Sequence, residues 1–508
     1  MVDPNDDLEP STPVLVGVGT ASRPVAGDPG GADVEALDLM VEATVAAFGD
    51  AGGQVAGGLV SRLGWVAVPT GTWGYSDAGR LIADKVKGAP GGPVRTVRVE
   101  VGVSQQTPLR VAWELIAAGE VDVALIVGGE AKATEQRRSR GGLGSIETSQ
   151  SGATPDECWQ AEGEIVAQAE IDAGMWQAVE HYACVDNALA AAEHSSVDEQ
   201  LDANADLWSQ LCAVAAANPA AAFADRAELR DREFLRVAGP GNRPLAHPYA
   251  KWHSAQWGVD QAAALVLCSV AVARELGVPR GRWVFPRVLV ESSSSVPLSR
   301  RAALHRWPAM EVLGQAAERH LGVALSSIGH VDLYSCFPVA VRVQQRELGL
   351  DRAATPTLTG GMAFGGGPFN NYTYQSTAAV IEAVRADPGS LGLVSTVSGL
   401  LTKPALAVWS TEPGEQGPPA LVADLAERAD AVTTRLEVVA DHVGPATVAT
   451  FTVTFEGADA QSAFVIADLD GSTRWIGTSS DPALLAAGTA GELTGRTVQI
   501  DGGSCTLA

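Results

Sequence analysis

Two places in the chain hold side chains whose types and spacing could do chemistry. Tyr334-Ser335-Cys336-Phe337 puts a phenol, a hydroxyl and a thiol within three positions at the end of an apolar stretch. A tyrosine can donate to an oxyanion or act as a general acid; alternatively, Tyr334 is an aromatic side chain that only packs. Cys336 is more simply explained as a buried structural thiol, which is usually inert. Ser104 lies at a predicted helix start, either as a weak, unassisted nucleophile or as a helix cap.

Both places belong to units that run from strand to turn to helix to strand. The first unit spans Thr96–Glu130 and ends in Gly128-Gly129-Glu130. The second begins with a strand at 331–334 and passes through a glycine-rich turn after Thr359. It continues into a predicted helix at 373–384 and a strand at 391–396. Strands that alternate with helices indicate βαβ units and a parallel or mixed sheet. We therefore predict two similar α/β halves that pack face to face.

The remaining chain divides where its composition changes. Between 131 and 249, helical stretches carry large residues, which predicts an inserted helical lid. The Pro- and Gly-rich run 412–419 is typical of a linker. Beyond it, the alternation in 447–456 predicts a half-buried strand of a small all-β, OB-like domain. The expected domains are the first half at 13–130 and 250–280, the lid at 131–249, the second half at 281–412 and the additional β domain at 418–508.

Composition and charge narrow the function classes. The 508 residues are 46% hydrophobic and 19% charged, which suits an α/β protein with buried parallel strands. No apolar run reaches the ~18 residues of a membrane span, and the acidic, polar start is unlike a signal peptide. We therefore expect a cytoplasmic protein. The net charge of -25 repels polyanions, so nucleic acid is not an expected partner.

The six cysteines give no sign of a metal site. They are scattered, with no CxxC pair and no regular spacing. This argues against a zinc site or a disulfide framework and favours reduced thiols. We expect no bound metal and no cofactor.

Four motifs, in order across residues 13–411, resemble those of thiolases. The likeness is nearest to the sterol-carrier-protein-X type and, with the extra C-terminal domain, to the mycobacterial type 1 thiolase-like proteins, which are named acetyl-CoA acetyltransferases by sequence. It implies a thiolase fold of two βαβαβ halves with an inserted lid. The motifs are Thr96–Glu130 with its AGE-x-D-V-x-L turn, Tyr334–Phe337, Gly360–Pro368, and Val397-Ser398-Gly399 followed by Leu401-Thr402-Lys403.

The residues that do chemistry in thiolases are replaced in this chain. The position of the nucleophilic cysteine falls on Gly102, and Gly367 stands where Gly-Gly-x-x-x-x-Gly-His-Pro has its histidine. Val397 stands where the second cysteine of Cys-x-Gly belongs. Tyr334 takes the place of the polar oxyanion-hole residue. The resemblance therefore implies that Tyr334 is the only candidate acid at a family active-site position.

Four residues near these motifs are candidates for contact with a ligand. Gln256 stands where thiolases have a serine that contacts pantetheine, just before Asp260–Ala264. Phe337 matches the family motif. Asn370 and Asn371 follow the glycine turn, where they either hydrogen-bond a ligand or cap the next helix. The resemblance thus implies a CoA thioester as a possible ligand.

These substitutions predict a thiolase-fold protein that binds acyl-CoA-like molecules in lipid or steroid metabolism, without conventional thiolase activity. One alternative is a retro-aldol lyase acting on β-hydroxy acyl-CoA through Tyr334, with Tyr372 or Tyr374 nearby. Some thiolase-fold lyases of steroid breakdown work in this way with a small OB-fold partner protein. Another alternative is residual acyl transfer through Ser104 or Cys336. Monomer and dimer stay open, because the insert or the extra domain can block the surface through which thiolases pair.

Overall fold

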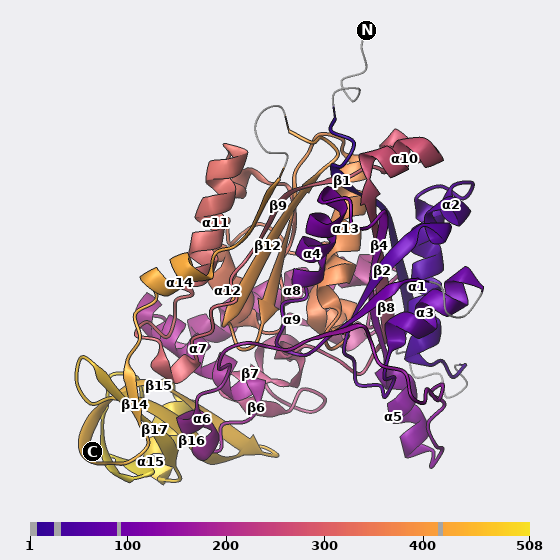
Figure 1. Ribbon diagram of the computed structural model, residues 1–508. Coiled ribbons are helices and arrows are strands. Elements are labelled where there is room, and N and C mark those ends of the chain that lie inside the picture. The colour runs from indigo at the N-terminus through magenta and orange to yellow at the C-terminus, as the bar shows by residue number, and fades with distance from the viewer. Residues whose placement is uncertain (1–7, 25–31, 89–92, 415–419) are drawn as a thin grey trace.

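The computed structural model describes residues 8–24, 32–88, 93–414 and 420–508. Figure 1 shows two sheets that form the body of the molecule and a third at one corner, where the C-terminus lies. The α/β architecture of two similar halves with an added β domain, predicted from the sequence, is confirmed.

The first sheet has six strands in the order β1-β8-β4-β2-β3-β5. Strands β2, β3 and β4 run parallel, and β8 lies antiparallel between β1 and β4. Helices on the outer face bury their apolar sides against these strands. The strands are β1 Pro13–Arg23, β2 Leu63–Pro69, β3 Arg95–Val99, β4 Val123–Ala131, β5 Glu157–Trp159 and β8 Asp260–Ser269, and the helices are α1 Ala36–Asp50, α2 Ala56–Ser61, α3 Ala78–Lys87 and α10 Val270–Leu276.

The second sheet has five strands in the order β10-β11-β12-β9-β13. Strands β9, β11 and β12 are almost continuously buried, as expected for strands covered on both faces. The strands are β9 Phe285–Glu291, β10 His330–Asp332, β11 Gly392–Ser398, β12 Lys403–Ser410 and β13 Leu421–Asp424, and the helices of this half are α11 Pro308–Leu321, α12 Pro338–Glu347 and α14 Ala426–Val432.

Two helices, α4 (Thr107–Ala117) and α13 (Tyr372–Ala386), lie between the two sheets (Figure 1). Their apolar side chains join one core with strands of both sheets. Proline in the first turn of α4 has no N–H to leave unsatisfied there. The two helices are equivalent in the two halves, so the turns that precede them meet near the middle of the molecule.

The insert between β4 and β8 is mainly helical, as expected of a lid. It also contains three short strands that its sequence does not predict: β5 pairs with the edge strand β3, and β6 and β7 join the third sheet. Strands of two or three residues have no periodicity of their own, and only their remote partners define them. The other elements of the insert are α5 Lys132–Arg140, α6 Gln168–Asp172, α7 Ala178–Glu193, α8 Val197–Ala217, α9 Arg232–Arg236, β6 Pro244–Ala246 and β7 Tyr249–Ala250.

The third sheet closes into a small barrel. Its strand pairs run β15–β16–β17–β19–β18 and back to β15, around a separate apolar core. The barrel begins at β14, later than the expected boundary at 418, because β13 pairs with β9 of the second sheet and α14 packs on α11. Its elements are β14 Glu437–Val439, β15 His442–Glu456, β16 Asp459–Asp468, β17 Thr473–Ser479, α15 Pro482–Thr489, β18 Thr497–Gly502 and β19 Ser504–Leu507.

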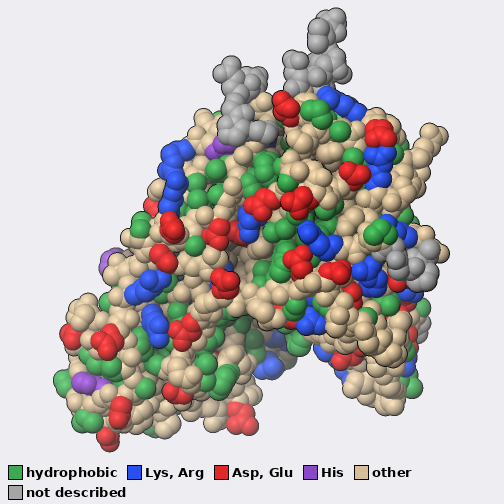
Figure 2. Space-filling view, in the orientation of Figure 1, with side chains coloured by type: hydrophobic (Ala, Val, Ile, Leu, Met, Phe, Trp, Pro, Cys, Tyr) green, Lys and Arg blue, Asp and Glu red, His purple; other side chains and the backbone are tan. Residues whose placement is uncertain are grey.

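The face in Figure 2 shows acidic and basic side chains interspersed rather than gathered into one basic stripe. Among the residues that the structure describes, no helix has the length and apolar character to cross a membrane.

Candidate functional site

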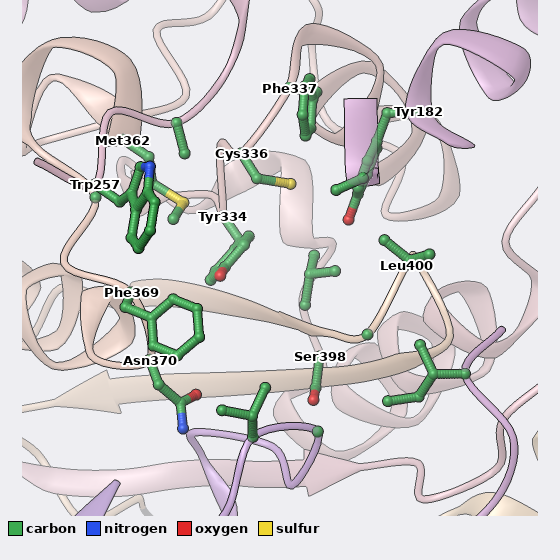
Figure 3. Close-up of a pocket in the computed structure, with 18 of the residues that line it drawn as sticks. Tyr182, Trp257, Tyr334, Cys336, Phe337, Met362, Phe369, Asn370, Ser398 and Leu400 are labelled. Carbon is green, nitrogen blue, oxygen red and sulfur yellow. The ribbon is translucent and has the colours of Figure 1, made fainter. Parts of the chain in front are cut away.

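A cavity of about 550 Å³ opens where the two halves and the insert meet (Figure 3). That volume suits a drug-sized ligand. All four substituted family positions line it, from four different elements: Gly102 in the β3–α4 turn, Tyr334 after β10, Gly367 in the glycine turn and Val397 in β11. Among the described residues, no Asp, Glu, Lys, Arg or His side chain lines the cavity. The site is therefore apolar, with a few neutral polar groups.

The backbone at Gly102 excludes the side chain that thiolases carry there. Its φ is +94°, a conformation that L-residues rarely adopt. A Cβ built on Gly102 would lie 2.8 Å from the Ala161 Cβ and 2.9 Å from the Ile165 Cδ1. The Gly102 carbonyl accepts a hydrogen bond from the buried Lys403 Nζ at 3.2 Å. Conformation and neighbours together leave no room for a nucleophile at this position.

The glycine turn is held by main-chain contacts from two sides. A single π-helical turn at Gly361–Gly365 precedes Gly367. The Gln256 N–H donates to the Met362 carbonyl, and the Gly367 N–H donates to the Gln256 carbonyl, both at 3.0 Å. The Met362 N–H donates to Ser335 Oγ at 3.0 Å. A Cβ on Gly367 would lie 3.2–3.3 Å from Met362 and Ala255, so a histidine here would need both neighbours to move.

Three hydroxyl and thiol groups in the cavity stay protonated at neutral pH. Burial raises the pKa of Tyr182 well above its usual value and that of Cys336 to about 12, and the Tyr182 hydroxyl hydrogen-bonds the Cys336 thiol. Burial also raises the pKa of Tyr334, the nearby Cys336 adds to the rise, and a hydrogen bond with Gln105 opposes it. Gln105 is oriented by the Thr373 N–H, which donates to its Oε1 at 2.9 Å. The described lining of the cavity therefore offers proton donors and no general base.

The candidate ligand-contacting residues divide into two groups. Phe337 and Asn370 line the cavity, Phe337 stacked on Tyr182 with ring centroids 4.5 Å apart (Figure 3). Gln256 and Asn371 do not line it. The Gln256 amide donates to the carbonyls of Lys251 and Ser254. Asn371 stands at the N-cap of α13, where its side chain makes no capping bond.

Ser104 is not part of the cavity wall. Its Oγ accepts the Gln106 N–H at 3.3 Å in the turn that precedes α4. This contact agrees with a role in shaping the helix start. Of the two residues weighed for acyl transfer, only Cys336 faces the cavity, as a protonated thiol.

Tyr372 lies beside Tyr334, and both Tyr372 and Tyr374 are outside the cavity lining. The Tyr372 ring meets the Tyr334 ring edge-on at 5.8 Å, and its hydroxyl donates to Asp332 Oδ1 at 3.0 Å. The fully buried Asp332 also accepts bonds from Thr357–Thr359 and from Ser376. These contacts fix the start of the glycine turn. Tyr372 thus supports the site and does not contact its contents.

Solved structures share this fold along the chain. A monomeric SCP2-thiolase-like protein type 1 from Mycobacterium smegmatis is 28% identical, with a TM-score of 0.80, and the match covers 99% of this chain and 100% of that one. An acetyl-CoA acetyltransferase from Syntrophomonas wolfei is 17% identical, with a TM-score of 0.54 over 79% of this chain and 99% of its own. The Ltp2–ChsH2(DUF35) aldolase is 18% identical, with a TM-score of 0.54 over 78% of this chain and 98% of its own. No protein-family model and no curated protein matches the sequence.

The chain has a thiolase-like fold and is similar along nearly its whole length to an SCP2-thiolase-like protein. Within this thiolase-like fold, motif reasoning missed Tyr182, Gln105 and Ile165, which line the cavity beside the motif residues. Tyr182 and Ile165 come from the insert, which carries no family motif. Gln105 lies just before α4, and its direction depends on α13 in the other half. The large aromatic residues of the insert were the only sequence signal for Tyr182.

Proposed function

We propose that this thiolase-like protein binds an acyl thioester in the apolar cavity, in lipid or steroid metabolism, without thiolase chemistry and without a metal or cofactor. The observation that carries the proposal is the cavity lined by Gly102, Tyr334, Gly367 and Val397, with no charged side chain among the described residues that line it. Gly102, Gly367 and Val397 leave no nucleophile and no imidazole there. Such a wall favours an uncharged, apolar acyl chain, because burying polar groups without partners is costly.

The anionic CoA portion would lie outside this wall. Trp176, Trp257 and Phe369 line the mouth and are 68%, 47% and 39% exposed, so they offer apolar contact to the uncharged pantetheine arm. The net charge of -25 opposes the phosphates beyond that arm. We therefore propose that affinity comes from the acyl and pantetheine parts.

The absence of thiolysis tests the proposal. We expect purified protein incubated with acetoacetyl-CoA and CoA to show no detectable cleavage. We also expect Gly102→Cys to stay inactive and to lose about 1–3 kcal/mol of unfolding free energy, because φ is positive and Ala161 and Ile165 fill the space. Gly57→Cys is the matched control, since a Cβ at Gly57 meets open space. Wild-type cleavage at ~10 s⁻¹, a typical turnover, would overturn the proposal.

Ligand binding should be insensitive to pH around neutrality. The pKa values of Tyr182 and Tyr334 are raised and that of Cys336 is about 12, so all three stay neutral until the solution is strongly alkaline. Calorimetric titration with an uncharged N-acetylcysteamine thioester should give the same Kd, within about twofold, from pH 6 to pH 9, because no lining group changes its bound protons. A tenfold change across that range would show that a titrating group contacts the ligand.

The lyase alternative has one observation in its favour. Tyr334 faces the cavity with a hydroxyl that can donate a proton. Retro-aldol cleavage also needs a base to remove the β-hydroxyl proton, and the described lining offers none that is ionised at neutral pH. Binding without cleavage therefore accounts better for the geometry.

We propose that the protein acts as a monomer in the cytoplasm. Strand β5 pairs with β3 through Val97 and Glu157 and their neighbours, so this chain itself covers the edge of the first sheet. The M. smegmatis protein of the same fold is described as monomeric. A separate OB-fold partner is not needed for this role, because the chain carries its own barrel.

A further inference from the structure

A short segment of the insert fills the space above Gly102. This strap, residues 160–167, runs without regular structure between β5 and α6. The Ile165 side chain lies between Gly102 and Gly399, two glycines of the thiolase-like motifs. Its Cδ1 is 2.9 Å from a Cβ built on Gly102, and its Cγ2 and Cγ1 are 3.0 and 3.3 Å from one built on Gly399. Ile165 also lines the cavity, so its side chain bounds the space open to a ligand next to Gly102.

The strap is anchored to the second half at three points. Lys403 Nζ donates to the Glu162 carbonyl as well as to that of Gly102. Ser295 Oγ donates to the Glu164 carbonyl at 2.7 Å. The fully buried Glu170, at the end of the strap, accepts the Ala167 N–H at 3.0 Å and the Ser299 N–H at 2.6 Å. These bonds hold Ile165 in place, so the side chain acts as a fixed wall.

We propose that Ile165 is the specificity-determining residue of the cavity and sets the length of acyl chain that it admits. The inference rests on the proposed binding function. A straight acyl chain that enters from the aromatic mouth ends against Ile165, and further methylenes must bend back or stay in water. Each buried methylene contributes about fourfold in affinity, so affinity rises with chain length and stops rising at the wall.

The test is a chain-length series of straight-chain acyl N-acetylcysteamine thioesters, titrated into wild type, Ile165→Ala, Ile165→Val and Val101→Ala. Ile165→Ala removes three carbons from the wall. We expect its affinity to keep rising for about two or three further methylenes, reaching tenfold or more above wild type for the longest chains. In Ile165→Val, affinity should keep rising for about one further methylene. This variant provides the test if the alanine variant fails to fold.

Val101→Ala is the matched control, because Val101 lines the cavity and is 52% exposed. It should weaken all thioesters alike without moving the length at which affinity stops rising. The same limiting length in all four proteins would overturn the inference and leave the proposed binding function intact. Failure of every thioester to bind wild type and both Ile165 variants at millimolar concentration would overturn the proposed function and the inference with it.

Discussion

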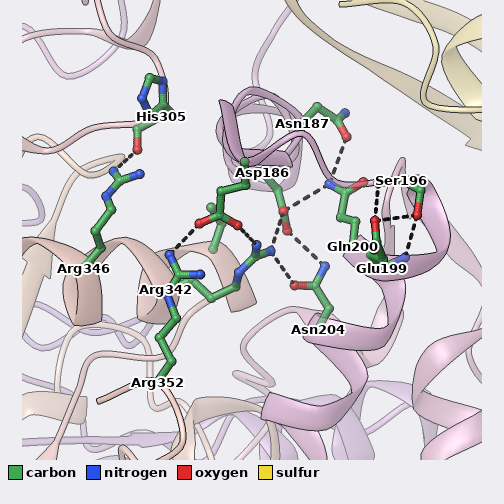
Figure 4. Close-up of polar contacts among 12 residues, drawn as sticks. Asp186, Asn187, Ser196, Glu199, Gln200, Asn204, His305, Arg342, Arg346 and Arg352 are labelled. Atoms are coloured by element: carbon green, nitrogen blue, oxygen red, sulfur yellow. Dashed lines mark hydrogen bonds and ion pairs between the residues drawn. The ribbon is translucent and has the colours of Figure 1, made fainter. Parts of the chain in front are cut away.

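Replacing Arg342 with alanine is expected to lower the unfolding free energy by about 3–5 kcal/mol, because it leaves a buried carboxylate without its cation. Arg342 in α12 donates from Nη1 to Asp186 Oδ1 at 3.1 Å and from Nη2 to Glu193 Oε2 at 3.0 Å (Figure 4). Asp186 is 0% exposed, and Tyr249 and Asn204 donate to its other oxygen at 2.7 and 3.0 Å. Urea unfolding followed by fluorescence measures the loss.

Arg352→Ala provides the matched control. Arg352 pairs with the same Glu193, but its side chain is half exposed, and an exposed pair contributes at most about 1 kcal/mol. The double variant Arg342→Met with Asp186→Leu should recover only part of the loss, since it removes the buried charge but leaves Tyr249 and Asn204 without their acceptor. An Arg342→Ala protein as stable as Arg352→Ala would show that this network does not hold the insert to the second half.

Deleting the barrel, residues 437–508, is expected to abolish ligand binding, because the barrel supports the helix that carries Tyr182. Asn187 Nδ2 in α7 donates to the Phe451 carbonyl of β15 at 2.8 Å, and the His247 N–H donates to the Val453 carbonyl at 2.8 Å. Each buried group left without its partner costs about 1–3 kcal/mol, so the summed loss approaches the whole stability of a domain. Binding of the hydrophobic dye ANS should rise in the truncated protein as its packing loosens.

The measurement compares residues 1–436 alone, the same fragment with residues 437–508 supplied as a separate chain, and the full-length protein. Recovery of thioester binding on adding the barrel would show that its contacts, and not the covalent link, support α7. Thioester binding by residues 1–436 at full-length affinity would show that the barrel has no part in the site. The solubility of residues 437–508 as a separate chain also tests whether the barrel folds by itself.

The parts of the fold that follow from sequence are those whose signal is local. The apolar run Leu63–Pro69 has the composition of a buried strand, and β2 has these bounds. The helix expected at 373–384 is α13, which spans Tyr372–Ala386. In both cases the pattern of apolar and polar residues within the segment is enough to predict the element. The motif positions met in one cavity because the turns before two equivalent helices must lie close together.

The parts of the fold that could not be predicted from the sequence depend on contacts with residues far away in the chain. Strands β6 and β7 exist because β15, far along the chain, pairs with Ala246. Ile165 fills the place above Gly102 only because Lys403 and Ser295 bind the strap. The absence of a catalytic cysteine was visible in the sequence. That its space is occupied by another part of the chain was not.

The pairing of β6 with β15 also sets an order of folding while the chain is synthesised on the ribosome. Ala246 must wait for Thr454 to emerge before their strands can meet. At ~5–20 residues per second, a separation of roughly 200 residues means a delay on the order of ten to forty seconds. During that interval the middle of the nascent chain exposes an unsatisfied sheet edge and the apolar side of α7, a state that chaperones recognise. The last segment to be made is therefore the one that completes the earlier folding of the middle.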